Sequence, residues 1–170
     1  DVPQLRPRVI MVAIREGLGE FRWPKPSETP APTVGEALKD LMAANGWEGA
    51  EEWARRANSI APTLVGGSKK HGGPDLGPTR ARKAWLSLGV DGKTIAEEAP
   101  EFGYVGLPRL TVKMAAKLQG FPDHWNFVGR KTNAYRQVGN AFPPPVAKAV
   151  GIQIRKAIRA PRKKSLRSVA

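Results

Sequence analysis

The feature that most restricts how this chain can fold is a continuous apolar run, residues 9–14 (VIMVAI), between Arg8 and Arg15. Six consecutive apolar residues bounded by charged ones predict a strand that is buried on both faces. A buried strand needs neighbours, and no other element precedes this one. We therefore expect the strand to join a larger sheet, either on another chain or on an N-terminal part of the same protein.

Capping residues and apolar stripes predict four helices. Thr33 and Glu36 have capping-box spacing, and the stripe that follows ends at Asn45-Gly46. Thr111 caps another helix, which stops at the turn over residues 120–123. Shorter patterns predict a helix over 50–57 and a last helix after the prolines 143–145. The apolar faces comprise Val34, Ala37, Leu38, Leu41, Met42, Met114, Ala115, Leu118, Val146, Val150, Ile154, Ala157 and Ile158.

The charge is strongly positive and unevenly placed. The chain has 28 Lys and Arg against 15 Asp and Glu, a net charge of +13. This excess favours a polyanionic partner, namely nucleic acid, an acidic membrane surface or an acidic protein. Residues 60–85 hold five basic residues, one acidic residue and several glycines, which predicts a long basic loop region. Residues 155–170 hold seven basic residues and no acidic one, which predicts a basic tail.

The composition also excludes several kinds of site. The chain has no cysteine, so it offers no disulfide, thiolate zinc ligand or thiol nucleophile. His71 and His124 lie far apart, and we expect no metal site. No apolar run approaches the length of a membrane span and no signal peptide is recognisable. We expect a cytoplasmic protein with no membrane partner.

Three sequence blocks are more specific than composition. The first is Gln4-Leu5-Arg6-Pro7-Arg8, directly before the apolar run. The second covers residues 109–123, and the third is residues 135–146, YRQVGNAFPPPV. Together they resemble motifs VIII, IX and X of the C5-cytosine-specific DNA methyltransferases, and the third block is the most distinctive. The segment between the first two blocks resembles the family's variable target-recognition domain.

The resemblance implies an α/β fold and a division of the chain. Residues 1–16 would give the motif VIII strand, and residues 129–160 would give motif X and a helix that returns to the catalytic domain. Both would complete a doubly wound, S-adenosylmethionine-dependent methyltransferase domain. Residues 17–108 would form a small, irregular target-recognition domain, residues 109–128 a motif IX segment that braces it, and residues 161–170 a basic tail.

The first block suggests contacts with the target base. Arg6 and Arg8 alternate, so both project from one side of an extended segment, and guanidinium groups are donor forks suited to phosphates and base carbonyls. The resemblance implies that Arg8 donates to the ring carbonyl of a flipped cytosine. Arg6 and Gln4 would support that site or nearby backbone. The simpler interpretation is two solvated arginines beside a strand.

The third block suggests cofactor contacts. Glycine lets a ligand approach the backbone, and asparagine both donates and accepts hydrogen bonds. The resemblance implies that Gly139, Asn140 and Ala141 form a turn before the last helix and contact S-adenosylmethionine. The simpler interpretation is a turn whose Asn140 caps proline-rich backbone. The second block is interpreted as structural, with packing favoured over phosphate contact for Arg109.

The recognition region offers the candidate DNA contacts. The resemblance places Thr63 on a phosphate near the flipped nucleotide and a glycine-rich loop after it. A solvated charged loop is the alternative. Most protein–DNA contacts go to the backbone rather than to bases, so the candidates could reach phosphates or base edges. The candidates are Thr63, Leu64, Gly66, Gly67, Ser68, Lys69, Lys70, His71, Arg80 and Arg82.

The chain lacks the family's catalytic parts, because it has no Pro-Cys, Glu-Asn-Val or N-terminal glycine-rich motif. We therefore expect the recognition portion of a DNA (cytosine-5-)-methyltransferase that flips its base from duplex DNA. A separate subunit or an N-terminal part would bring the cysteine. A noncatalytic DNA-binding remnant and an RNA cytosine methyltransferase remain alternatives. Membership of a restriction–modification pair stays open, and the target sequence is not readable.

Overall fold

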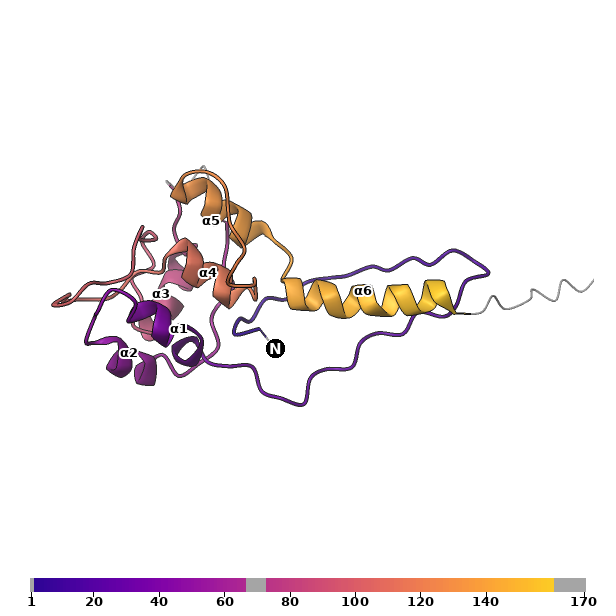
Figure 1. Cartoon of the computed structure of the whole chain (residues 1–170), viewed down its shortest axis with the longest axis horizontal. Helices are drawn as coiled ribbons and strands as arrows, with labels where there is room; N and C mark the ends of the chain where they lie inside the picture. The colour runs from indigo at the N-terminus through magenta and orange to yellow at the C-terminus, as the bar shows by residue number, and fades with distance from the viewer. Residues whose placement is uncertain (1, 67–72, 161–170) are drawn as a thin grey trace, which may run out of the picture.

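The computed structural model describes residues 2–66 and 73–160 of the 170-residue chain (Figure 1). Its regular secondary structure is helical. Over these two ranges β-type pairing is limited to isolated bridges, such as the one between Gln4 and Ala61. The helices are α1 (Val34–Met42), α2 (Ala50–Arg56), α3 (Thr79–Ser87), α4 (Val112–Leu118), α5 (Lys131–Asn140) and α6 (Pro144–Arg159).

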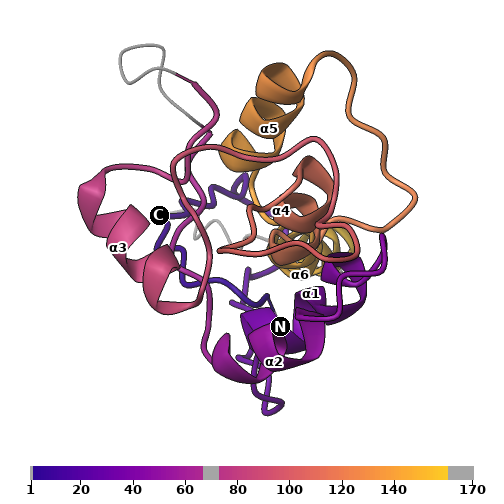
Figure 2. The ribbon, with the colours of Figure 1, turned by 90° about the vertical axis from the view of Figure 1, so that its left-hand side faces the viewer.

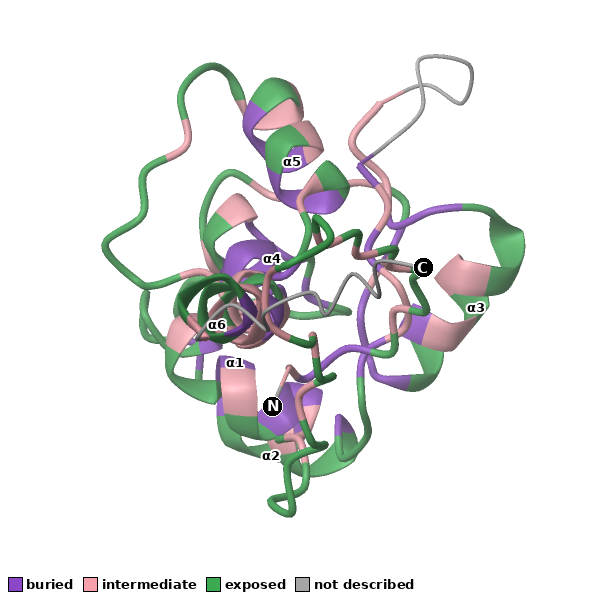
Figure 3. Ribbon diagram, turned by 90° about the vertical axis from the view of Figure 1, so that its right-hand side faces the viewer, coloured by how far each residue is buried: buried purple, intermediate pink, exposed green. Residues whose placement is uncertain are grey.

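The first five helices form one body around an apolar core. α1 packs against α2 and α4, and α4 packs against α5. Figure 3 shows the buried positions of α4 and α5 turned inward. Trp85 of α3, Tyr135 of α5 and Leu64 are fully buried in this body. The core therefore joins residues from the recognition region to those of the second and third sequence blocks.

α6 projects from this body and is flanked by the extended residues before α1 (Figure 1). These residues run out along one side of the helix and back along the other, and the Gly19 N–H donates to the Ala157 carbonyl at 2.9 Å. Val150 and Ala157 are buried, whereas Ile158 is exposed. The predicted apolar face of α6 is therefore covered only in part.

The predicted strand over residues 9–14 has no neighbouring strand among the described residues, so its burial in a larger sheet stays a prediction. These residues are extended but pair with nothing, and Val9 and Met11 are 99% and 92% exposed. A strand is defined by the hydrogen-bonded neighbour that it pairs with, and the described residues supply none here. The doubly wound sheet expected around this strand is likewise absent from the described part of the chain, which is rich in helix.

The capped helices are confirmed, and two further helices were missed. Thr33 makes the full capping box with Glu36, and Thr111 accepts from the Met114 N–H. α3 lies where a basic loop was predicted, and Trp85 anchors it to the core. α5 carries Gly139 and Asn140 as its last two residues, so the predicted turn begins only at Ala141. The proposed domain boundaries remain predictions.

Candidate functional site

The first sequence block is tied to the recognition region and to the second block by a buried glutamine. Gln4 is 8% exposed; its Nε2 donates to Gln119 Oε1 at 2.8 Å and its Oε1 accepts from the Leu64 N–H at 2.8 Å. The backbone reinforces this alignment, because the Leu5 N–H donates to the Ala61 carbonyl at 2.8 Å. Residues 4–5 and 61–64 therefore lie side by side.

Gln119 extends this cluster to the third block. It is fully buried, and its Nε2 also donates to the Val138 carbonyl at 2.8 Å. The last carbonyls of a helix have no partner within the helix, so a buried helix end needs donors from elsewhere. Gln119 supplies one such donor to α5. The sequence interpretation did not single out Gln119. It could have been found as a polar residue four positions after the buried Ala115, where the apolar face of α4 would continue past the end of the helix.

Arg6 donates to a further carbonyl at the end of α5 and to one in the recognition region. Its two terminal nitrogens donate to the Leu64 carbonyl and, at 2.7 Å, to the Gly139 carbonyl. α5 has no basic residue in its last turn, so the Arg6 cation also meets the negative end of the helix dipole. Burial, aided by the nearby charge of Arg8, lowers the pKa of Arg6, although a guanidinium stays protonated. Arg6 thus clamps the recognition region to the end of α5.

Two buried donors next to this clamp have no hydrogen-bond partner within residues 2–66 and 73–160. They are Arg6 Nε and the Tyr135 hydroxyl. Burial raises the pKa of Tyr135; the charge of Asp75 acts in the same direction and that of Arg6 opposes it. Tyr135 is therefore a neutral donor at physiological pH.

Two glycines let the recognition region touch the end of α5 directly. A Cβ placed on Gly139 would lie 2.4 Å from both the N and Cα atoms of Gly66. A Cβ placed on Gly66 would lie 2.6 Å from Asn140 Oδ1. Real Cβ atoms do not approach other atoms so closely, because such distances lie well inside van der Waals contact. A Cβ on Gly139 would meet backbone, so this packing requires glycine there, whereas a Cβ on Gly66 would require the Asn140 side chain to move.

Asn140 is the group at this junction that fits a ligand. It is exposed at the end of α5, and its amide can donate and accept. The Ala141 N–H, in contrast, already bonds to the Gln137 and Val138 carbonyls. Gly139 is buried, and its carbonyl is taken by Arg6. Of the three predicted cofactor residues, Asn140 has a polar side chain that makes no hydrogen bond within residues 2–66 and 73–160.

Arg8 and Thr63 lie at the open side of the cluster. Arg8 is exposed, and within the described residues its guanidinium donates only to the carbonyl of its neighbour Pro7, at 2.8 Å. The Thr63 hydroxyl donates to the Leu5 carbonyl at 2.7 Å, which fixes its oxygen beside the first block. Arg6 and Arg8 therefore differ, since one is enclosed and the other has donors to spare.

The remaining DNA-binding candidates are divided. Gly67, Ser68, Lys69, Lys70 and His71 lie outside the described residues. Arg80 and Arg82 both lie on α3, with Arg80 exposed. Figure 2 shows α3 and α5 on either side of residues 64–66. A pocket of about 580 Å³ beside α3 is lined by the cations Arg82, Lys83 and Lys93 together with Leu86, Tyr104 and Leu107.

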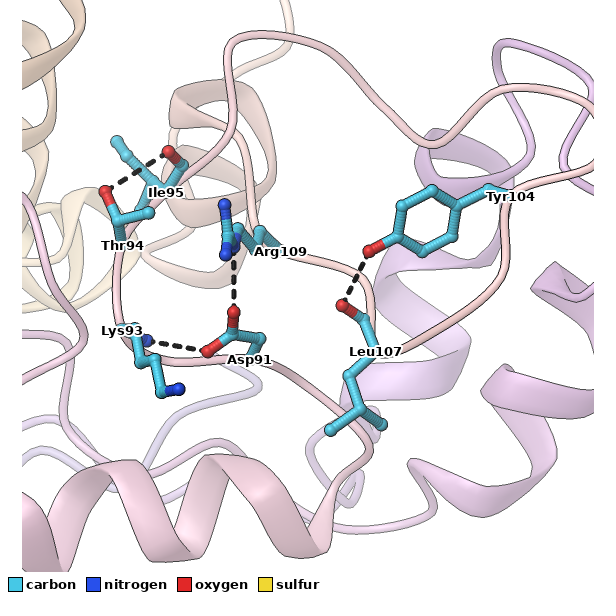
Figure 4. Close-up of polar contacts among 7 residues, drawn as sticks. All are labelled: Asp91, Lys93, Thr94, Ile95, Tyr104, Leu107 and Arg109. Atoms are coloured by element: carbon cyan, nitrogen blue, oxygen red, sulfur yellow. Dashed lines mark hydrogen bonds and ion pairs between the residues drawn. The ribbon is translucent and has the colours of Figure 1, made fainter.

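Arg109 is held by protein rather than left free. Its Nε donates to Asp91 Oδ2 at 2.8 Å, while the Lys93 N–H donates to Asp91 Oδ1 at 3.0 Å (Figure 4). Burial alone would raise the pKa of Asp91, but these hydrogen bonds and the two neighbouring cations leave the pKa lowered. The ion pair joins residues 91–93 to the start of the second block, in keeping with the structural role expected for Arg109.

Residues 2–66 and 73–160 contain no group of three histidine or acidic side chains that could hold a metal ion. Among the described helices, none has the length and apolar character needed to cross a bilayer.

The comparisons with known proteins agree with the three sequence blocks. A model of the C-5 cytosine-specific DNA methylases matches residues 1–156. Type II methyltransferase M.NaeI of Lentzea aerocolonigenes is 61% identical over 162 residues, which cover 92% of this chain and 39% of that protein. Type II methyltransferase M.NgoMIV of Neisseria gonorrhoeae is 49% identical, over 93% of this chain and 51% of that protein.

A shorter match is 50% identical over 46 residues, 27% of this chain, to DNA (cytosine-5)-methyltransferase 1 of Mus musculus. The chain therefore belongs to the C-5 cytosine-specific DNA methylase family. It spans between about two fifths and one half of the length of the two Type II methyltransferases.

Proposed function

We propose that this chain is the C-terminal, DNA-recognising portion of a DNA (cytosine-5-)-methyltransferase. The reaction would transfer a methyl group from S-adenosylmethionine to C5 of a cytosine flipped out of duplex DNA. The cysteine would come from an N-terminal part or a separate subunit. Family membership supports this proposal, as does the fraction of its relatives that the chain spans.

One observation carries the proposal. The buried Gln4 and Gln119 and the half-buried Arg6 join the first block, the recognition region and the end of α5 in one polar cluster. Burying polar side chains costs free energy unless they are hydrogen-bonded, so this cluster is stable only while the segments that it bonds stay in register. Arg8 and Asn140 then lie around this cluster with polar side-chain atoms available to ligands, and Thr63 lies beside them with its hydroxyl bonded to the Leu5 carbonyl.

The roles of these residues follow from the chemistry. Addition of the cysteine thiolate to C6 of the ring would place negative charge on its carbonyl oxygen, and Arg8 would donate to that oxygen. Arg6 and Gln4 would hold the backbone from which Arg8 projects. Asn140 would orient S-adenosylmethionine, which supplies the methyl group when bound. Thr63 would contact a phosphate beside the extruded nucleotide.

A reconstitution experiment tests the proposal. The chain is combined with the N-terminal part of its protein, isotopically labelled S-adenosylmethionine, and either duplex DNA or transfer RNA. We expect 5-methylcytosine in the duplex. Methyl transfer to transfer RNA alone would favour the RNA-methylating relative, and no transfer to either would favour a noncatalytic DNA-binding remnant.

The names of M.NaeI and M.NgoMIV lead us to propose a restriction–modification setting as well. The substrate would then be the DNA of the cell that makes the enzyme. A cytoplasmic location, close to the nucleoid, belongs to the same proposal.

The predicted recognition loop gives an ionic-strength test. We expect the Lys69→Ala/Lys70→Ala variant of the assembled enzyme to bind duplex DNA more weakly and with a shallower salt dependence. Each lost phosphate contact lowers the slope of log K against log salt by about 0.9, so two contacts lower it by about 1.8. Fluorescence anisotropy at several salt concentrations measures this slope.

The matched control removes two cations from α2, as Arg55→Ala/Arg56→Ala. It makes the same change in net charge far from the proposed interface, so its slope should stay close to that of the unmodified enzyme. Equal slopes in both double variants would remove the two lysines from the interface.

A further inference from the structure

The recognition segment, defined here as residues 64–66, and the α5 terminus, residues 138–141, are packed with no space between them. Backbone meets backbone at Gly66 and Gly139, and the Asn140 side chain lies against Gly66. The recognition segment leads directly into the predicted DNA-contacting loop, and the α5 terminus carries the residue that fits the cofactor. The two proposed ligands would therefore bind on either side of a single contact.

Gln119 holds both partners of this contact. Through Val138 it bonds the α5 terminus directly, at 2.8 Å. Through Gln4 it reaches the recognition segment, because Gln4 bonds both Gln119 Oε1 and the Leu64 N–H at 2.8 Å. These amides are buried, so water is not available to replace any of these bonds. The two segments are thus joined through three hydrogen bonds in series, Leu64 to Gln4, Gln4 to Gln119 and Gln119 to Val138, and Gln119 takes part in two of them.

We infer that Gln119 is a positioning residue that couples duplex binding to S-adenosylmethionine binding. It contacts neither ligand in this inference, which rests on the function proposed above. When DNA holds the recognition segment in one position, Gln4 and Gln119 hold the α5 terminus in one position too. The Asn140 amide is then oriented toward the cofactor. By thermodynamic linkage the effect is reciprocal: the cofactor must tighten duplex binding by the same factor.

The experiment measures this factor by titration calorimetry. The assembled enzyme is titrated with S-adenosylhomocysteine, the demethylated product, with and without a duplex that the enzyme methylates. The coupling factor is the ratio of the two dissociation constants, and we expect about tenfold tightening by the duplex. In Gln119→Met, which keeps an unbranched chain of similar length but loses the amide, we expect a factor below about two.

The result distinguishes a coupling role from a merely structural one. A structural role would weaken binding of each ligand, or lower stability, and leave the ratio at its original value. An unchanged ratio in Gln119→Met would overturn the inference, as would a ratio of one in the unmodified enzyme. An unmodified enzyme that binds no S-adenosylhomocysteine and methylates no duplex would instead overturn the proposed function.

A second variant covers the case in which Gln119→Met fails to fold. Gly66→Ala places a Cβ 2.6 Å from Asn140 Oδ1, the end of a side chain that can rotate away, so it disturbs the contact itself. We expect it also to lower the coupling factor. Gly151→Ala is the control, because among the described residues no atom lies within 4 Å of its added Cβ. A normal factor in Gly66→Ala, or an equal loss in Gly151→Ala, would contradict the inference.

Discussion

Replacing Gly139 by alanine should destabilise the protein, although alanine is ordinarily the better helix former. Gly139 lies in the last turn of α5, where propensity alone predicts that alanine stabilises by up to about 1 kcal/mol. The added Cβ would instead lie 2.4 Å from the N and Cα atoms of Gly66 and 2.7 Å from the Val65 carbonyl carbon. These are backbone atoms, which no rotamer change can move away.

We expect the collision to outweigh the helix preference, with a loss of about 1–3 kcal/mol in the free energy of unfolding, the range typical of overpacked cores. Urea unfolding of the assembled enzyme measures this loss. Binding of S-adenosylhomocysteine should fall as well, because Asn140 follows Gly139 directly and moves with it.

The control is Gly151→Ala in α6, another glycine in a helix but with open space around its Cβ. Here propensity acts alone, so stability should be unchanged or slightly higher. If the two alanine variants unfold at the same urea concentration, residues 66 and 139 are not in contact in the protein.

Local signals in the sequence predicted the helices whose ends are set by local chemistry. Thr33 with Glu36 and Thr111 with Met114 form caps within four residues, so no distant contact is needed to place α1 and α4. α3 has no side-chain cap and a basic, weakly apolar sequence. Its position depends on Trp85 entering the core, which is a long-range contact that residues 79–87 do not reveal.

The candidate site divides in the same way. Residue type and spacing singled out Arg6, Arg8 and Asn140, but they did not distinguish the enclosed Arg6 from the exposed Arg8. That difference depends on the Leu64 and Gly139 carbonyls, which are 58 and 133 residues away along the chain. The strand over residues 9–14 stays a prediction for a related reason, because β pairing needs a partner that the described residues do not contain.

Removal of the Arg8 side chain should nearly abolish methyl transfer while sparing most of the duplex affinity. The Arg8 guanidinium is exposed, and within the described residues it bonds only the adjacent Pro7 carbonyl, so its remaining donors are open to a ligand. A donor aimed at an oxygen that gains charge during reaction is worth about 10²–10³ in rate. Duplex affinity comes mainly from the many phosphate contacts, so the loss of one arginine should change it by only a few-fold.

Single-turnover transfer of labelled methyl groups in the assembled enzyme measures the rate, and anisotropy measures duplex affinity. Arg8→Lys keeps the charge without the planar fork, so we expect an intermediate rate. Arg15→Ala removes another exposed arginine from the same extended segment and should react at the normal rate. If Arg8→Ala and Arg15→Ala are equally fast, Arg8 does not touch the reacting base, and the first sequence block serves only to hold the recognition segment through Gln4 and Arg6.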